Sequence, residues 1–377
     1  MRSTMKKLLL VDMLYAFIAA ALAVMVPLYL VDIDMDITSI GLVLSAIPLG
    51  FMLLRIVFAA IADRVGTKTV EVMESFAMLL AISIYALSRS AQAFAIAQFS
   101  EGIRDAGFWA TARTDIIKAS HRKHLDRAFA YFIGLRQLAD GIGRVVIGIV
   151  LVYFSFQTSF SILFFLSVAM LLLIITINKN PFKGFRVDRK LLKMIFHKRS
   201  KHFWQHSLGV TLQQLVPGVL IGFLLPLYLY AEVGFDYYGT ATMLAIFSLV
   251  LAIANLLALR FRLSSGAILF TVFLMIPAFI LLPYLNGAII LPVLVLAIGS
   301  GCGNILTEKI ISMEVKKRGD VSTDIGALYF PLMTSLFLFT ALGGAAIAAW
   351  GYEAVFYFSA FLTLYYVIYA MEAFKKE

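Results

Sequence analysis

Hydrophobic residues follow one another in long runs along this chain, and short polar segments separate the runs. A helix needs about 20 mostly apolar residues to cross the hydrocarbon layer of a bilayer. We interpret as membrane-spanning helices the runs near residues 8–31, 39–61, 69–88, 91–117, 128–155, 158–177, 205–230, 238–259, 265–284, 287–311, 324–349 and 352–373. Nothing alternates at period two, and membrane-embedded backbone must satisfy its own hydrogen bonds. The pattern therefore predicts an all-α polytopic membrane protein with about twelve transmembrane helices.

The tetrapeptide PLYL occurs twice, at residues 27–30 and 226–229, and each copy closes a long apolar run. Each copy also leads into a short acidic segment, which ends at Asp36 in the first case and at Asp236 in the second. The repetition predicts two pseudo-symmetric six-helix bundles, residues 1–177 and 205–377, a layout typical of transporters whose halves rock about a midplane site. Residues 178–204 between them are polar and basic, and we interpret them as a cytoplasmic linker that meets anionic lipid headgroups.

Composition and charge agree with the bilayer as the solvent of this chain. Only 14% of its residues are charged, whereas a soluble domain carries roughly 25%. The net charge of +10 would suit a nucleic-acid partner, but 26 of the 32 Lys and Arg residues fall in alternate loops and at the ends. Membrane orientation explains this distribution, with both termini in the cytoplasm and no nucleic acid bound. We expect a multi-pass protein of the cell membrane, whose signal-peptide-like start continues to Val31 and stays as the first helix.

The segment AAIADRVGTK, residues 59–68, lies between the second and third predicted helices. It resembles the signature of the major facilitator superfamily, G-x-x-x-D-R-x-G-R-[RK], and the helix number and basic linker resemble the family along essentially the whole chain. The matching positions are Asp63, Arg64, Gly66 and Lys68, whereas Ala59 and Thr67 differ from the pattern. The resemblance implies a gating role for this loop, with Arg64 paired to a carboxylate near the inner end of the fourth helix, where Asp115 is best placed.

Two further patterns of the family are present only in part. The fourth helix has Gln98, Glu101 and Gly102 in the register of R-x-x-Q-G, so the arginine that is often assigned to proton coupling is missing. The fifth helix has several glycines but lacks the Gly-Pro pair that marks many exporters of the antiporter type. The missing Gly-Pro pair weakens an assignment to efflux without excluding it.

Ionisable residues inside membrane helices are expensive unless they are paired or hydrated, which makes them functional candidates. Those near the middle of the fourth and fifth helices are Glu101, Arg104, Asp105, Arg136, Asp140 and Arg144. Two interpretations stay open: a cavity for substrate and protons, or an internal salt-bridge network that fastens the two helices. The second half offers neutral amides at Gln213, Gln214 and Asn304.

Two weaker candidates accompany these residues. Asp12 lies about one turn into the first helix, where we expect it to reach the cytoplasmic interface, with proton binding as the alternative. Trp109 is one turn from Asp105 and is a candidate for the lining of the cavity.

These observations predict a secondary active transporter that moves a small solute by alternating access. Glu101, Asp105 and Asp140 are the candidate proton carriers, and the arginines beside neutral amides favour an organic anion or zwitterion as the substrate. The alternative is a drug or multidrug efflux permease, followed by a lipid flippase or a sensor on the same fold. No P-loop motif is present, the histidines lie in or beside loops, and Cys302 is alone. We expect no catalytic residues, metal or cofactor, and a protein that acts as a monomer.

Overall fold

The computed structural model describes residues 3–119, 125–177, 198–261, 263–315 and 321–373, and every regular element in these ranges is helical. The first half contains α1 (Ser3–Asp32), α2 (Ile37–Val65), α3 (Thr67–Leu87), α4 (Ala91–Ala119), α5 (Leu125–Tyr153) and α6 (Phe156–Ile177). The second half contains α8 (Lys201–Val219), α9 (Leu225–Leu227), α10 (Tyr237–Arg260), α11 (Ser265–Phe273), α12 (Met275–Leu281), α13 (Ile290–Val315), α14 (Val321–Leu328) and α15 (Phe330–Ala373). The all-helical membrane class is confirmed.

By length and apolar composition, nine helical segments of the described chain can cross a membrane. Helices α4 and α5 are not among them, because both carry charged residues along their length. Helix α15 runs over 44 residues, but Gly351 inside it has a φ of 77°, which interrupts the helix close to the predicted break. The total of twelve transmembrane helices and the cytoplasmic position of both termini stay predictions.

The helix expected at 205–230 is longer in the structure. It begins at Lys201, where the Ser200 hydroxyl accepts a hydrogen bond from the Phe203 amide at 3.2 Å and caps the helix. The helical path continues to Glu232 through two π-helical turns, Leu220–Leu224 and Tyr228–Glu232, on either side of α9. The linker at 178–204 stays a prediction, since residues 178–197 lie outside the described ranges and residues 201–204 form the first turn of α8.

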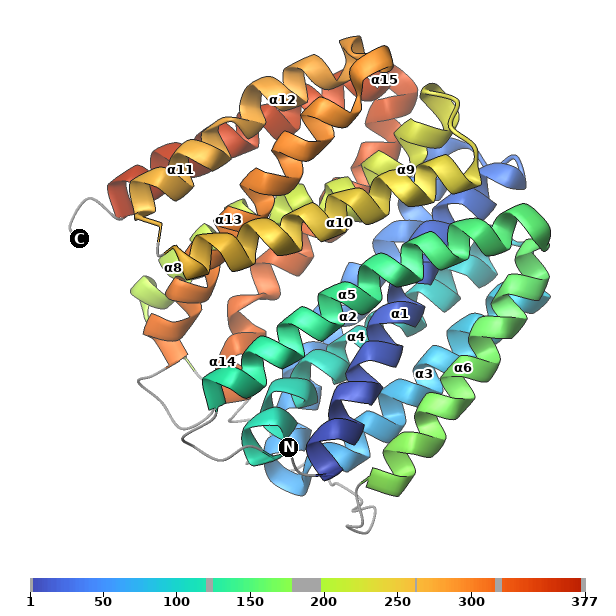
Figure 1. The fold of residues 1–377 in the computed structure, drawn as a ribbon, viewed down its shortest axis with the longest axis vertical. Helices are drawn as coiled ribbons and strands as arrows, with labels where there is room; N and C mark the ends of the chain where they lie inside the picture. The colour runs from blue at the N-terminus through green and yellow to red at the C-terminus, as the bar shows by residue number, and fades with distance from the viewer. Residues whose placement is uncertain (1–2, 120–124, 178–197, 262, 316–320, 374–377) are drawn as a thin grey trace.

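Helices α1–α6 gather on one side of the molecule, and helices α8–α15 gather on the other (Figure 1). Two seams join these groups, because α2 packs on α15 and α5 packs on α10. At the first seam the backbones approach closely: a Cβ built on Gly344 would lie 2.4 Å from the Ile37 carbonyl oxygen. Small residues at such contacts let membrane helices pack tightly.

The ends of the two PLYL segments share their local geometry. Asp36 caps α2 by accepting a hydrogen bond from the Ser39 amide at 2.9 Å, and Asp236 caps α10 by accepting one from the Gly239 amide at 2.7 Å. The hydrogen bonds from Ser39 hold the pKa of the exposed Asp36 carboxyl below its ordinary value. Two residues before each cap the backbone takes a positive φ, 59° at Asp34 and 80° at Gly234.

Helix α4, which carries the largest group of buried charges, touches α2 backbone to backbone. A Cβ built on Gly102 would lie 2.2 Å from the Ile47 carbonyl oxygen, and one built on Gly50 would lie 2.5 Å from the Phe99 carbonyl oxygen. Real Cβ atoms do not approach backbone this closely, so the two glycines set the distance between α2 and α4.

We expect Gly102→Ala to destabilise the protein by more than about 2 kcal/mol, because the added methyl group forces two buried helices apart. Gly266→Ala is the matched control, since no atom lies within 4 Å of a Cβ built there. Thermal unfolding of both variants in detergent checks the prediction. Equal melting temperatures for the two variants would contradict the close α2–α4 contact.

Candidate functional site

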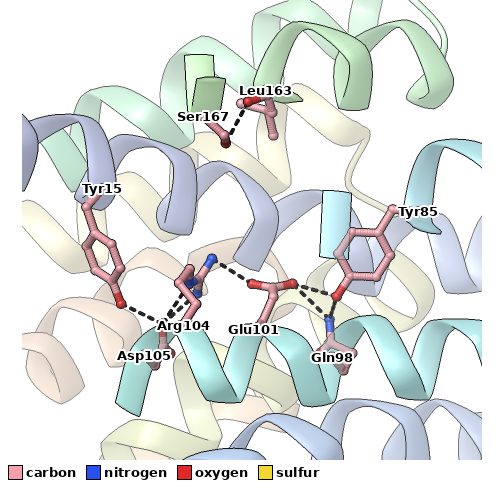
Figure 2. Close-up of polar contacts among 8 residues, drawn as sticks. All are labelled: Tyr15, Tyr85, Gln98, Glu101, Arg104, Asp105, Leu163 and Ser167. Carbon is pink, nitrogen blue, oxygen red and sulfur yellow. Dashed lines mark hydrogen bonds and ion pairs between the residues drawn. The ribbon is translucent and has the colours of Figure 1, made fainter. Parts of the chain in front are cut away.

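Arg104 of α4 lies between two acidic residues of its own helix (Figure 2). Its Nη1 is 3.0 Å from the Glu101 carboxylate, and its Nη2 is 2.7 Å from Oδ1 of Asp105. The predicted spacing of three and four residues therefore does place the three side chains on one face. Arg104 is 2% exposed, so these two carboxylates replace the water that would otherwise solvate its charge.

Two tyrosines extend this group to the neighbouring helices (Figure 2). Tyr15 of α1 donates a hydrogen bond to Asp105 at 2.5 Å, and Tyr85 of α3 donates one to Glu101 at 2.5 Å. Gln98 donates to the Tyr85 hydroxyl at 2.5 Å. The result is one polar chain across α1, α4 and α3, and its tyrosines were not predicted as site residues.

The two carboxylates of this chain differ in exposure. The Asp105 side chain is 23% exposed, whereas that of Glu101 is 4% exposed. Tyr85 of α3 binds Glu101, which is an enclosed counter-charge for Arg104, while part of the Asp105 side chain stays exposed. Arg104 is thus held by one enclosed acid and one accessible acid.

The charges of α5 form a separate group. Arg144 binds Asp140 with distances of 3.0 Å and 3.3 Å, within the same helix. Arg136 instead lies with its guanidinium 4.0 Å from the Trp109 ring centre and 5.4 Å from that of Phe108. The described residues show no ion pair between α4 and α5, so their contact at this depth runs through cation–π stacking rather than through a shared salt-bridge network.

The predicted amides of the second half do come together, between α8 and α13. Gln214 donates to Asn304 at 2.7 Å, and the Thr307 hydroxyl donates to Gln213 at 2.8 Å. Gly303 makes room for this arrangement, because a Cβ there would lie 2.4 Å from the Gln213 amide nitrogen. The glycines of α13 thus serve close packing, and the amides form a neutral hydrogen-bonded cluster.

The loop that resembles the family signature turns at Gly66, whose φ is 100°. A residue with a Cβ is strained in that conformation, which explains the glycine. Thr67, which departs from the pattern, donates a hydrogen bond to Asp115 at 2.7 Å. Asp63 accepts one from Thr323 of α14 at 3.3 Å. The loop therefore contacts α4 and the second half, while pairing of Arg64 with Asp115 and a role for Lys68 stay predictions.

The expectation that Asp12 reaches the membrane interface is wrong. Only 3% of its surface is exposed, and α1 packs against both α5 and α6. Three further buried charged residues had no predicted role, and one of them, Asp324 of α14, pairs with Arg199 at 3.3 Å. Arg55 of α2 donates to the Trp109 carbonyl at 2.8 Å, and Glu74 of α3 lies against Gly107, where a Cβ would meet its side chain at 2.8 Å.

Comparison with known proteins places this arrangement in context. A family model described as Major Facilitator Superfamily matches residues 8–330. No significant match was found among curated protein sequences.

Several solved structures share the fold. The nucleoside transporter NupG has a TM-score of 0.75 and 15% identity, with 99% of this chain and 100% of that chain covered. A D-xylose-proton symporter has a TM-score of 0.72 and 9% identity, with 96% and 97% covered. The human organic anion transporter MFSD10 (TETRAN) has a TM-score of 0.70 and 15% identity, with 98% and 100% covered.

We expect Glu101→Gln to cost about 3–5 kcal/mol of stability, because it leaves a buried guanidinium with half of its counter-charge. Asp105→Asn should cost less, since water reaches that side chain and compensates part of the loss. Denaturant or thermal unfolding of the two variants gives the comparison. A larger loss in Asp105→Asn would show that Glu101 is not the fixed counter-charge.

We also expect Asp63→Asn and Arg64→Ala to leave the protein inserted and folded while slowing solute flux about tenfold, or roughly 1.4 kcal/mol in the barrier. The reason is that these changes remove polar contacts between the signature loop and the helices packed against it. Initial rates in proteoliposomes measure the effect, with the exposed Arg89→Ala as the control for simple charge removal. Normal rates in both loop variants would leave only a topological role for the loop.

Proposed function

Because this chain belongs to the Major Facilitator Superfamily, we propose that it is a secondary active transporter that moves a small solute by alternating access. The multi-pass helical fold and the transporters that share it indicate transport rather than catalysis. The two seams, α2 with α15 and α5 with α10, are the surfaces on which two groups of helices can rock.

We propose an organic anion or a zwitterion as the substrate. The observation that carries this proposal is the ion pair between Arg104 and Asp105, at 2.7 Å, in which the acid is 23% exposed and the arginine is buried. A carboxylate or phosphate of a solute fits the planar fork of arginine and can take the place of Asp105, while Glu101 keeps the guanidinium in position. The opposite half contributes neutral amides, Gln214 and Asn304, which hydrogen-bond a solute without repelling its charge.

The proposed coupling ion is the proton. When a solute anion displaces Asp105 from Arg104, the freed carboxylate lies in a poorly hydrated place, and a proton neutralises it at little further cost. Anion and proton then enter the site together, and the net charge of the site does not change. One of the structural neighbours is a proton symporter, which is compatible with this coupling.

The competing function is efflux of lipophilic cations. It would require the arginines to stay bound to their acids while Asp105 or Asp140 receives the cation. Proteoliposomes that contain this protein alone separate the possibilities, using organic acids, amino acids and cationic dyes as probes, with and without a proton gradient. Uptake or exchange of acids or amino acids supports the proposal, whereas movement of cationic dyes alone supports efflux. Lipid movement without solute flux would indicate a flippase.

We expect Arg104→Gln to weaken binding of the anionic probes at least about tenfold, roughly 1.4 kcal/mol, because a charge-assisted hydrogen bond is lost. Arg136→Gln tests the second arginine in the same way. Cationic probes should bind both variants at least as tightly as they bind the parent protein. The measurement is ligand-dependent thermal stabilisation over both panels, with Arg89→Gln as the control. Unchanged anion binding in either Arg104→Gln or Arg136→Gln, together with cation export by the parent, would overturn the assignment to anions.

A further inference from the structure

A small cavity, which we call the α8 cavity, lies inside the second half where α8 meets α11, α12 and α15. Its lining includes Gln213, Pro217, Met275, Thr363 and Tyr366, and the other lining residues are aliphatic. The centre of a water molecule can occupy about 10 Å³ of this space. A cavity needs about 10–15 Å³ by the same measure to hold one water. The α8 cavity is therefore too small for a solute, and its size matches a single water molecule.

The hydroxyl of Tyr366 on α15 has no hydrogen-bond partner among the described residues. Tyr366 is 1% exposed, so this hydroxyl cannot reach bulk water instead. A buried hydroxyl without a hydrogen bond destabilises a protein, and the large majority of such groups in folded proteins have a partner. Because Tyr366 lines the α8 cavity, the cavity is the place from which a partner can be supplied.

The side chain of Gln213 brings a second unused group to the α8 cavity. Its oxygen accepts a hydrogen bond from Thr307 at 2.8 Å, whereas no described residue accepts one from its amide nitrogen. Gln213 is 5% exposed, so the amide also lies away from bulk solvent. The amide nitrogen is a donor, and the Tyr366 hydroxyl can donate or accept. One water between them therefore finds a complementary partner on each side.

The backbone of α8 is interrupted at the same place. Pro217 lies inside the helix and has no amide hydrogen, so the Gln213 carbonyl four residues earlier loses its usual helical donor. Beyond Pro217 the helical path continues as the π-helical turn Leu220–Leu224. Ordered water is one of the groups that satisfy carbonyls freed by a proline in membrane helices. With the Tyr366 hydroxyl and the Gln213 amide, this carbonyl makes three groups in need of a partner, and a buried water makes about three hydrogen bonds.

We propose that the α8 cavity is a binding site for one ordered water molecule, held by the Tyr366 hydroxyl, the Gln213 side-chain nitrogen and the Gln213 carbonyl. This water completes the hydrogen bonds that the bend of α8 leaves open. It also connects α15 to the neutral cluster between α8 and α13, because Gln213 already binds Thr307. The polar contacts of the second half then extend across four of its helices rather than two.

The water site gives the two neighbouring glutamines different roles. Gln213 is used inside the second half, by Thr307 on one side and by the water on the other. Gln214 binds Asn304 at 2.7 Å and is only half-buried. Of the two glutamines predicted for the substrate cavity, Gln214 is thus the one that can meet a solute. This last assignment rests on the proposed function, whereas the water site does not.

The first experiment is the thermal unfolding of Tyr366→Phe, in which the sign of the change is decisive. In a dry cavity the substitution removes an unsatisfied hydroxyl and should raise the melting temperature. With the water bound it removes a hydrogen bond and should lower the melting temperature, by about 1–2 °C. We expect the decrease. Tyr228→Phe is the matched control, because this buried tyrosine donates to the Leu282 carbonyl at 3.4 Å and must also show a decrease.

Radiolytic labelling in isotopically labelled water detects the water itself, because hydroxyl radicals formed from a bound water oxidise the side chains beside it. Met275 lines the α8 cavity and is 3% exposed, whereas Met243 of α10 is 8% exposed and does not line it. We expect Met275 to be labelled several times faster than Met243 in the parent protein in lipid nanodiscs. Pro217→Ala, which returns an amide donor to the Gln213 carbonyl, should slow the labelling of Met275. Pro226→Ala, at the start of α9, should leave it unchanged.

An unchanged or higher melting temperature in Tyr366→Phe would overturn the proposal. Labelling of Met275 that is no faster than that of Met243 would do the same. Both measurements are made on the folded protein without any solute. A chain that moves no solute would therefore refute the proposed transport function and leave the water site standing.

Discussion

An arginine keeps its charge wherever it lies, so an arginine inside a membrane helix must obtain its counter-charges from the protein. Arg104 satisfies this requirement twice, with Glu101 on one side and Asp105 on the other. Each acid is in turn bound by a tyrosine of a different helix. The need to neutralise one guanidinium thus fixes how α1 and α3 sit on α4, and the glycine contact between α4 and α2 completes the group.

This constraint also makes the halves chemically unequal. The first half holds its buried arginines with acids and aromatic rings, whereas the second half gathers amides and hydroxyls between α8 and α13. A neutral hydrogen-bonded cluster can rearrange at lower cost than a buried ion pair, because no charge is left exposed to low dielectric. In the proposed transport cycle, the charged group of the first half is therefore suited to recognition of the solute, and the neutral cluster between α8 and α13 is suited to rearrangement around it.

Much of this architecture was predictable, because apolar runs of bilayer length dictate helices and leave few alternatives. The face shared by Glu101, Arg104 and Asp105 also follows from spacing along one helix. The hydrogen-bond partners of these residues cannot be predicted from spacing along the helix. Tyr15 and Tyr85 lie in apolar runs, where a tyrosine is usually interpreted as an anchor at the membrane interface. Their hydrogen bonds join residues that are 90 and 16 positions apart in the sequence, so they depend on how the helices pack. The burial of Asp12 likewise depends on how α5 and α6 cover α1, which no local pattern records.

The turns that follow the two PLYL segments show which features the two halves of the chain have in common. Asp34 adopts a φ of 59° where the second copy has Gly234 at 80°. An L-residue with a Cβ pays on the order of 1 kcal/mol for this conformation, and glycine pays almost none. The two copies therefore share a positive-φ turn and a capping aspartate, although the first copy is α-helical to Asp32 and the second reaches its turn through the π-helical segment Tyr228–Glu232. The second copy has one more residue between PLYL and its cap, and the π-helical segment accommodates it, so a comparison by residue identity alone would pass over the turn that the halves share.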